Sequence, residues 1–204
     1  MNRVLNQAGV LILIVLSLPI ALYAFYSGLG AEVSSTVVQR LQQFPVFGAM
    51  HMLGGGLALL VGGFQFSGRL RAARPQLHRW LGRIYLFGIL MGGVSAIAAA
   101  PGATGGVVAA CGFGLLGILW LYSGAQAYLA IRAGDIHTHR AWMMRNFAMT
   151  FAAVTLRIYL GLMTGPMGLT FEEAYPAVAW ISWVPNLMLV EWFLLNRRPA
   201  PQAS

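Results

Sequence analysis

Two of the four histidines in the sequence are followed directly by arginine, as His78-Arg79 and His139-Arg140. Each pair stands where a polar loop rich in arginine gives way to a long apolar run. Two imidazoles at the mouths of two membrane helices could be the axial ligands of one haem b held between those helices. Arginines beside the ring could pair with its propionates, because a guanidinium group matches a carboxylate geometrically. The interpretation without a ligand is that a His-Arg pair marks a helix start at the membrane surface.

The predicted haem site combines these two histidines with the arginines around them. His78 and His139 would ligate the iron, and the arginines that would hold the propionates are Arg79, Arg83, Arg140 and Arg145. Gly82, one helical turn after His78, leaves room for a flat ring, whereas Met143 takes that position after His139. Ordinary packing of membrane helices also uses small residues, which is the alternative explanation for Gly82.

Further polar residues are expected inside the membrane, away from the His-Arg pairs. His51 lies five residues into a predicted span, and Arg157 lies 18 residues beyond His139, about 27 Å further along a helix. Both are therefore expected in the outer half of the bilayer, where they could meet. An arginine at the bilayer centre costs about 2.5–3.5 kcal/mol, so an intramembrane charge indicates a functional site by default. The alternatives are helix packing for His51 and structural pairing or snorkelling for Arg157.

A non-haem metal site is the second chemical hypothesis. The residues that would supply nitrogen and oxygen ligands for zinc, copper or iron are His78, His137, His139 and Glu191. The two-residue spacing of His137 and His139 does not put both imidazoles on one face of a helix, so ligation by both would need an extended loop. Glu191 has a simpler alternative, which is a salt bridge to an inner arginine at the level of Arg83 or Arg145.

No catalytic residue is predicted. The sequence contains no H-E-x-x-H, G-x-S-x-G, Walker or dinucleotide-binding glycine pattern, and its single cysteine excludes a cysteine-based metal motif. The third hypothesis needs no cofactor: an accessory or structural membrane subunit whose inner arginines bind anionic headgroups or a partner. A transport role also stays open.

The composition predicts the elements that must position these residues. The chain of 204 residues is 58% hydrophobic and only 9% charged, with a mean hydropathy of +0.71, whereas a soluble domain carries about a quarter charged residues. Apolar runs of about 20 residues are long enough to cross a bilayer as helices. We therefore predict an all-α polytopic membrane protein with six spans, at residues 7–29, 46–66, 80–100, 107–131, 141–162 and 177–196. The first span is interpreted as a retained anchor, because it is too long for the apolar region of a signal peptide.

The arginines predict the orientation of the bundle. The net charge of +8 comes from 13 arginines and no lysine, and most of them stand in short loops between apolar runs. With six spans, the loops at 67–79 and 132–140 and both termini fall on one side, which the positive-inside rule makes cytoplasmic. This distribution predicts contact with anionic lipids at the cytoplasmic face and, without an exposed soluble domain, argues against nucleic acid as a partner. A short interfacial helix is predicted within 30–45 and a disordered tail at 197–204.

An internal repeat links the two His-Arg pairs. Residues 63–79 align with residues 124–140 at a constant offset of 61, with six identities in 17 positions. Self-similarity at a fixed offset indicates structural repeats in a membrane protein. Because the offset covers two helices, spans two and three become equivalent to spans four and five, as two tandem hairpins that form a four-helix core. The repeat therefore predicts that His78 and His139 lie at equal depth and face one central object.

Two longer motifs carry a family resemblance. With a histidine in the second span and an acidic residue in the last, "LHRWLGRIY" and "HRAWMMRNFAMTFAAVTLRIYL" resemble a bacterial family of predicted membrane proteins catalogued as domain of unknown function 2306. The resemblance runs from about His51 to Glu191. It implies a polytopic protein of the bacterial cytoplasmic membrane and supplies no established activity. The residues that match the family pattern are His51, His78, Arg79, Gly82, Arg83, His139, Trp142, Arg145 and Arg157.

The layout is also loosely similar to that of b561-type membrane cytochromes, which carry haem-ligating histidines on a four-helix core within six helices. This similarity is architectural and rests on no shared motif. The favoured specific function is accordingly a haem b-binding redox protein that passes electrons between a quinone and a partner.

Overall fold

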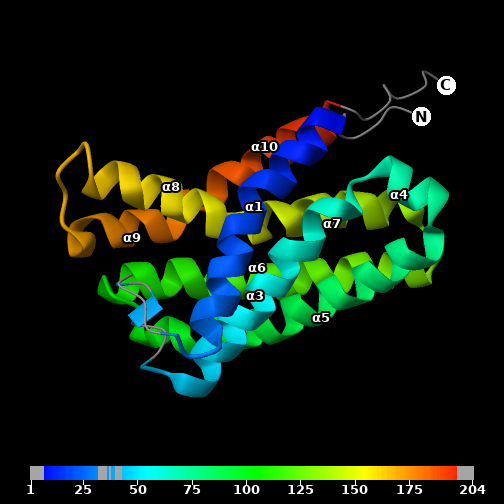
Figure 1. The fold of residues 1–204 in the computed structure, drawn as a ribbon. Helices are drawn as coiled ribbons and strands as arrows, with labels where there is room; N and C mark the ends of the chain where they lie inside the picture. The colour runs from blue at the N-terminus through cyan, green and yellow to red at the C-terminus, as the bar shows by residue number, and fades with distance from the viewer. Residues whose placement is uncertain (1–6, 32–35, 37, 40–42, 197–204) are drawn as a thin grey trace.

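The computed structural model describes residues 7–31, 36, 38, 39 and 43–196, and this part of the chain is helical without any strand (Figure 1). The helices are α1 (Gln7–Gly28), α3 (Pro45–Gln65), α4 (Gly68–Ala73), α5 (Pro75–Ala99), η1 (Ala100–Gly102), α6 (Gly106–Arg132), α7 (Ile136–Thr150), α8 (Ala152–Thr164), α9 (Phe171–Ile181) and α10 (Val184–Leu195). The all-α fold class predicted from the composition is confirmed.

Six helical stretches are long and apolar enough to cross a membrane, as the sequence predicts. They are Gln7–Gly28, Pro45–Gln65, Pro75–Gly102, Gly106–Arg132, Ile136–Thr164 and Phe171–Leu194. The third stretch combines α5 with η1, the fifth combines α7 with α8, and the sixth combines α9 with α10. Contact with the lipid bilayer follows from these lengths and from their apolar composition.

The third and fifth spans begin five residues earlier than predicted. Pro75 opens α5, where its fixed φ suits a helix and its missing N–H is not needed. Asp135 caps α7, because its carboxylate accepts a hydrogen bond from the Thr138 backbone N–H at 2.9 Å. His78 and His139 are consequently the fourth residues of their helices rather than the last residues of the preceding loops.

The fifth span is interrupted near its middle, and the last span starts earlier than predicted. The fifth span is interrupted after Thr150, whose hydroxyl donates back to the Asn146 carbonyl at 3.1 Å, and such a bond inside a helix favours bending. The last span begins at Phe171, six residues before the predicted start, because Thr170 and Glu173 form a capping box.

The helices α3 and α5 pack with their backbones almost in contact. A Cβ atom on Gly54 would lie 2.6 Å from the Gly92 nitrogen and 2.7 Å from the Gly88 carbonyl oxygen. Gly88 and Gly92 stand four residues apart, which is the spacing of small residues in closely packed membrane helices. These glycines set the distance between the two helices of the first hairpin.

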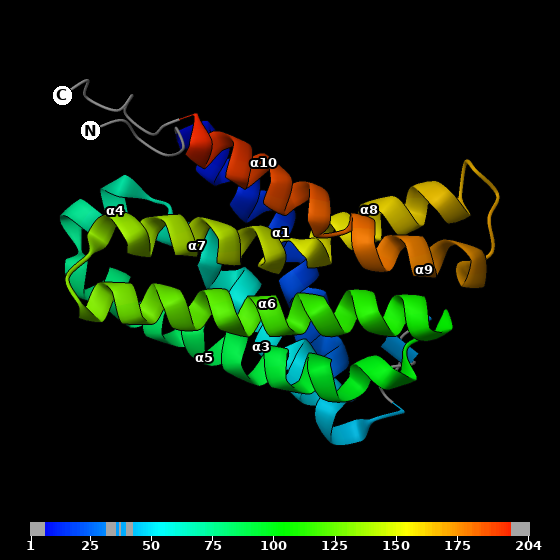
Figure 2. The ribbon, with the colours of Figure 1, turned by 180° about the vertical axis from the view of Figure 1, so that it is seen from behind.

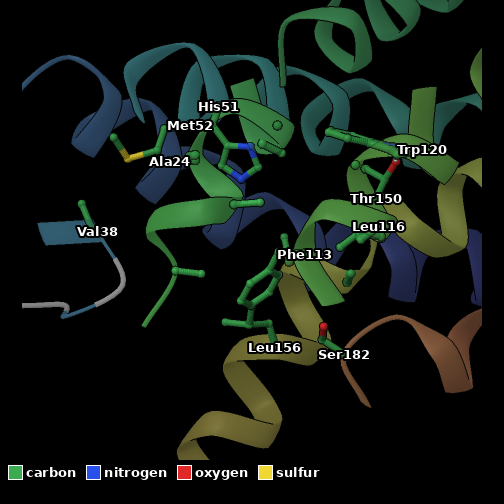
Figure 3. Close-up of a pocket in the computed structure, with 18 of the residues that line it drawn as sticks. Ala24, Val38, His51, Met52, Phe113, Leu116, Trp120, Thr150, Leu156 and Ser182 are labelled. Carbon is green, nitrogen blue, oxygen red and sulfur yellow. The ribbon is translucent and has the colours of Figure 1, made fainter. Parts of the chain in front are cut away.

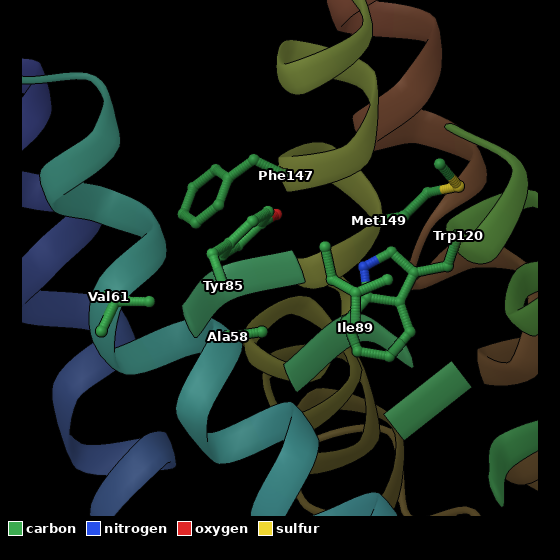
Figure 4. Close-up of a cluster of buried hydrophobic side chains, with 7 residues drawn as sticks. All are labelled: Ala58, Val61, Tyr85, Ile89, Trp120, Phe147 and Met149. Atoms are coloured by element: carbon green, nitrogen blue, oxygen red, sulfur yellow. The ribbon is translucent and has the colours of Figure 1, made fainter. Parts of the chain in front are cut away.

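The core draws its residues from four helices, α3, α5, α6 and α7 (Figure 4). Its buried side chains are Ala58, Val61, Tyr85, Ile89, Trp120, Phe147 and Met149. Around these four helices, α1 packs against α3, α9 packs against α6 and α8, and α10 packs against α7 (Figure 2). The predicted four-helix core is therefore present, with the first and last spans outside it.

The repeat seen in the sequence is visible in how the two hairpins meet. The starts of α5 and α7 are 61 residues apart, at Pro75 and Ile136. Tyr85 and Asn146 are also 61 residues apart, and the Tyr85 hydroxyl donates a hydrogen bond to the Asn146 Oδ1 at 2.7 Å in the buried core. Repeat-related residues can touch only near the axis that relates the two copies, so this contact supports two equivalent hairpins.

The two arginine-rich loops lie at the same end of the bundle, hereafter the arginine-rich end. This end carries α4, the start of α7, the start of α1 and the end of α10 (Figures 1 and 2). The opposite, distal end carries the α8–α9 connection. That the arginine-rich end faces the cytoplasm stays a prediction. The predicted tail at 197–204, residues 37 and 40–42 of the predicted interfacial helix, and Arg3 lie outside the described residues.

Candidate functional site

The two histidines of the predicted haem site meet at the arginine-rich end. His78 on α5 and His139 on α7 are both partly buried, and the charges of His139 and Arg71 both act on His78. We call His78, His139, Arg71 and Arg140 the paired-histidine site. The two histidines thus occupy the same position, the fourth residue, in their two helices, and their ligation of one haem stays a prediction.

The imidazole of His139 is held in one orientation by a neighbouring helix. Its Nδ1 donates a hydrogen bond to the Ala127 carbonyl on α6 at 2.8 Å. A carbonyl oxygen can only accept, so Nδ1 carries the proton and Nε2 of the neutral ring keeps its lone pair. Histidines that bind metals are commonly oriented in this way.

The imidazole of His78 has a different environment. Its Nδ1 is buried and has no hydrogen-bond partner among the described residues, and the same holds for the Nε2 of Gln65. Both groups lie close to Gly82, since the Gln65 Oε1 is 3.5 Å from the position that a Cβ of Gly82 would take, and Gly82 is one turn from His78 on α5. Buried polar atoms without partners are uncommon because each costs about 1–3 kcal/mol. This boundary between α3 and α5 therefore has unused capacity for hydrogen bonding or ligation.

The arginines that were predicted to hold propionates differ in their exposure to solvent. Arg140 is partly buried near Arg71: burial and the charge of Arg140 together lower the pKa of the Arg71 guanidinium. Arg79 and Arg83 are exposed at the same end, and the Arg83 guanidinium lies 4.8 Å from the centre of the Trp80 ring.

Arg145 is bound to the last span. Its Nε and Nη2 donate to the two carboxylate oxygens of Glu191, and the Nη2–Oε2 distance is 2.9 Å. Its guanidinium also lies 4.8 Å from the centre of the Trp142 ring. The salt bridge that the sequence suggested for Glu191 is confirmed, and it joins α7 to α10.

The four-residue metal site proposed as an alternative is not assembled. No group of three or more histidine, cysteine, aspartate or glutamate side chains within the described ranges could hold a metal ion. His137 is exposed and lies in α7 two residues before His139, so the two imidazoles leave the helix in different directions.

A buried polar network occupies the centre of the bundle. The Tyr85 hydroxyl bonds to Asn146 Oδ1 at 2.7 Å and to Thr150 Oγ1 at 2.8 Å. The Trp120 Nε1 donates to Thr150 Oγ1 at 2.8 Å, and the Asn146 Nδ2 donates to the Trp120 carbonyl and to Ser123 Oγ, each at 2.8 Å. Tyr85 lies seven residues after the first histidine of the pair, about 10 Å along α5. The network therefore separates the arginine-rich end from the distal half.

The distal half contains a cavity of about 190 Å³ between α1, α3, α6, α8 and α9, hereafter the distal cavity. His51 and Arg157 both line it. Figure 3 shows His51 on one side of the cavity, with Trp120 and Thr150 across from it. His51 and Arg157 therefore lie in the same half of the bundle, and their depth in the bilayer stays a prediction.

Two polar groups that line the cavity, His51 and Arg157, are anchored to backbone carbonyls. The His51 Nδ1 donates to the Gly92 carbonyl at 3.0 Å, and Arg157 Nη1 donates to the Ala153 carbonyl at 2.7 Å. The Arg157 guanidinium also lies 5.7 Å from the centre of the Tyr23 ring. Within the described part of the chain, no carboxylate forms an ion pair with Arg157.

Several site residues were not found from the sequence. Gln65 and Arg71 were overlooked at the paired-histidine site, although both are identities within the 61-residue repeat. The polar network was overlooked as well, although Tyr85 and Asn146 stand at the same offset. The repeat was the signal that could have found them.

A family model described as a predicted membrane protein (DUF2306) matches residues 48–194. The chain belongs to the DUF2306 family. No curated protein and no solved structure matches the chain. The DUF2306 match extends from α3 to α10, so it includes His51, His78, His139 and Arg157, while α1 precedes it. Membership confirms the resemblance seen in the motifs and the membrane class of the protein, and it brings no activity with it.

Proposed function

We propose that this DUF2306 chain is a membrane redox protein that binds haem b at the paired-histidine site, with His78 and His139 as the axial ligands. The observation that supports the proposal is the equivalent placement of His78 and His139, each as the fourth residue of its helix at the arginine-rich end of the bundle. When bound, haem supplies one-electron chemistry that no side chain of this site has.

The residues around the two imidazoles fit such a group. The His139 Nδ1 is committed to the Ala127 carbonyl at 2.8 Å, which leaves Nε2 for a metal. His78 also has a ring nitrogen that the described residues leave without a hydrogen bond. Gly82 keeps the adjacent turn of α5 free of a side chain, and the nearest atom to its missing Cβ is 3.5 Å away.

The positive charges at this end would pair with the propionates. Arg140 and Arg71 lie beside the imidazoles, and Arg79 and Arg83 are exposed at the same end. Arg145 is already paired with a carboxylate of its own chain, so we assign it to helix packing rather than to haem.

Optical spectroscopy of the purified full-length protein tests this proposal. After expression with added haem precursor, we expect a Soret band that shifts when dithionite is added, and loss of that band in the His78→Ala/His139→Ala double variant. His137→Ala is the matched control, because His137 is exposed on the same helix and should leave the spectrum unchanged. A colourless wild-type protein, or a double variant with an unaltered spectrum, rules the proposal out.

A second candidate is an accessory membrane subunit without a cofactor, favoured by the exposed arginines at one end of the bundle. Arg69, Arg74, Arg79, Arg83 and Arg132 are all exposed there and would bind anionic headgroups or a partner. The same preparation separates the two candidates, since a colourless protein that copurifies with a stoichiometric partner supports only this one.

A further inference from the structure

The distal cavity has the size and the lining of a site for one aromatic ring. Its volume of about 190 Å³ is close to that of an engineered apolar cavity, about 150 Å³, that accepts benzene. Aromatic side chains that line it come from three helices, with Tyr23 on α1, Phe113 and Trp120 on α6, and Tyr175 on α9. Rings of this kind favour stacked or edge-to-face contact with a planar guest.

Arg157 and His51 supply a charged donor and a nitrogen acceptor, beside the hydroxyl groups of Tyr23, Thr104, Thr150, Tyr175 and Ser182, which also line the cavity. Arg157 has five N–H donors, of which Nη1 is used on the Ala153 carbonyl. The His51 Nδ1 is used on the Gly92 carbonyl, so the neutral ring offers Nε2 as an acceptor. A guest that satisfies both groups must carry an oxygen that accepts and a hydroxyl that donates.

The depth of these groups decides where the guest comes from. His51 is six residues from the distal start of α3, and Arg157 is seven residues from the distal end of α8, so each lies about 10 Å along its helix from that end. Most of the cavity wall comes from membrane-spanning helices, and the segments between them add Val38, Phe44, Ala103 and Thr104. A guest that is soluble in lipid can reach this depth from the bilayer.

We propose that the distal cavity binds the head-group ring of a lipid-soluble quinol. One ring hydroxyl donates to Nε2 of His51, and the oxygen on the other side of the ring accepts from the guanidinium of Arg157. A fatty-acid carboxylate would satisfy Arg157 alone, because an ionised carboxylate has no proton to donate to His51. A hydrocarbon chain would satisfy neither group.

The cavity is connected to the centre of the protein by hydrogen bonds. Trp120 and Thr150 line it and are both bonded to the central network, where Thr150 Oγ1 lies 2.8 Å from the Tyr85 hydroxyl. Occupancy of the cavity therefore changes the surroundings of Trp120, which makes tryptophan fluorescence a suitable readout. Binding needs no haem, so this inference goes beyond the function proposed above.

The test is a titration of the detergent-purified protein with decylubiquinol under reducing conditions, followed by quenching of tryptophan fluorescence. It is carried out on the His78→Ala/His139→Ala protein as well as on the wild type, so that failure of the haem proposal does not affect the result. We expect saturable binding in both. Absence of saturable quenching in both proteins overturns the inference.

Two matched glycine variants locate the binding site. Gly55 lines the cavity, and Gly161 lies on the surface of α8; neither has an atom within 4 Å of the position that a Cβ would take. Gly55→Val places a side chain in the cavity and should weaken binding about tenfold or more, whereas Gly161→Val should leave it unchanged. Equal affinity in the two variants contradicts the assignment.

The polar assignment is tested at Arg157. Arg157→Gln should weaken decylubiquinol binding about tenfold or more, since it removes a charged donor, while Arg157→Lys should keep part of it. The remaining circular dichroism signal and elution volume show whether each variant is folded. If oleate binds to the protein and decylubiquinol does not, the cavity is a carboxylate site and the quinol assignment is wrong.

Discussion

The paired-histidine site and the distal cavity use the same device to orient a histidine and then differ in what they place opposite it. In both, Nδ1 donates to a backbone carbonyl on a neighbouring helix, Ala127 for His139 and Gly92 for His51. The second group of the site is another histidine in the first case and Arg157, which lines the same cavity, in the second. Two imidazoles suit a metal, whereas an imidazole and a guanidinium suit an organic guest with two oxygens.

The two regions also differ in how their positive charges are stabilised. At the arginine-rich end most guanidinium groups are exposed, as Arg83 is, and the partly buried Arg145 forms an ion pair. In the distal cavity the partners of Arg157 are the Ala153 carbonyl and tyrosine side chains, Tyr23 and Tyr175. A charge at a bundle end can reach water or headgroups, and a charge inside the bundle must be met by protein or by a guest.

The largest expected effect separates the two histidine sites directly. His78→Ala and His139→Ala should each shift or weaken the Soret band, because a bis-histidine haem loses one axial ligand. His51→Ala should keep the band, because His51 lies in the distal half. Absorption spectra of the three purified variants provide the measurement. If His51→Ala changed the spectrum as strongly as His78→Ala, the haem would not lie at the paired-histidine site, and the proposed difference between the two regions would be wrong.

The next effect concerns the contact between α3 and α5, where an added side chain should lower the stability of the whole fold. Gly54→Ala puts a Cβ 2.6 Å from a backbone nitrogen of α5, and overpacking of this kind costs about 1–3 kcal/mol. The neighbouring Gly55→Ala meets open space and gains helix propensity of about 1 kcal/mol. Thermal unfolding midpoints in detergent should therefore move in opposite directions. Two equal midpoints would show that the α3–α5 contact is less tight than its glycines indicate.

A smaller effect is expected at the ion pair between α7 and α10. Glu191→Gln should lower the free energy of unfolding by about 1–2 kcal/mol, between the values for exposed and buried pairs, since the two side chains are 21% and 39% exposed. Thermal unfolding measures this loss, with the exposed Glu172→Gln as the control. The haem spectrum should not change. A changed spectrum would indicate that Arg145 also binds the propionates.

The smallest expected effect concerns the start of α7, which positions His139. The backbone N–H and the hydroxyl of Thr138 lower the pKa of Asp135 below its ordinary value. The folded state thus favours the ionised carboxylate, so this contribution is present at neutral pH and is lost as the pH falls through the acidic range where aspartate protonates. The thermal midpoint of the wild type should therefore fall more steeply on acidification than that of Asp135→Asn, whose amide caps the helix without titrating. Parallel pH profiles would contradict this.

Much of the fold was predictable because membrane insertion depends on local composition. All six spans were found, with errors of a few residues at the starts, and these errors have identifiable causes. Pro75 and the Asp135 cap extend α5 and α7 into sequence that is polar on average, and the capping box at Thr170 does the same for α9. Hydropathy does not detect a helix turn that lies outside the apolar run.

The candidate sites were predictable only where the repeat constrained them. The offset of 61 residues brought His78 and His139 to equal positions, and the structure places them within electrostatic reach. The buried Nε2 of Gln65, the nearness of Arg71 and the polar network around Tyr85 depend on side-chain directions, which no spacing in the sequence specifies.

The sequence by itself determined that this is a helical membrane protein with six spans, two related hairpins and arginines gathered at one end, because apolar length, repeat offset and charge distribution can be read along a single chain. Only the tertiary structure decided which side chains meet. The rotation of each helix about its axis follows from packing, such as the contact of Gly54 with Gly88 and Gly92. That rotation brings His51 and Arg157 to the lining of one cavity and His139 to the Ala127 carbonyl.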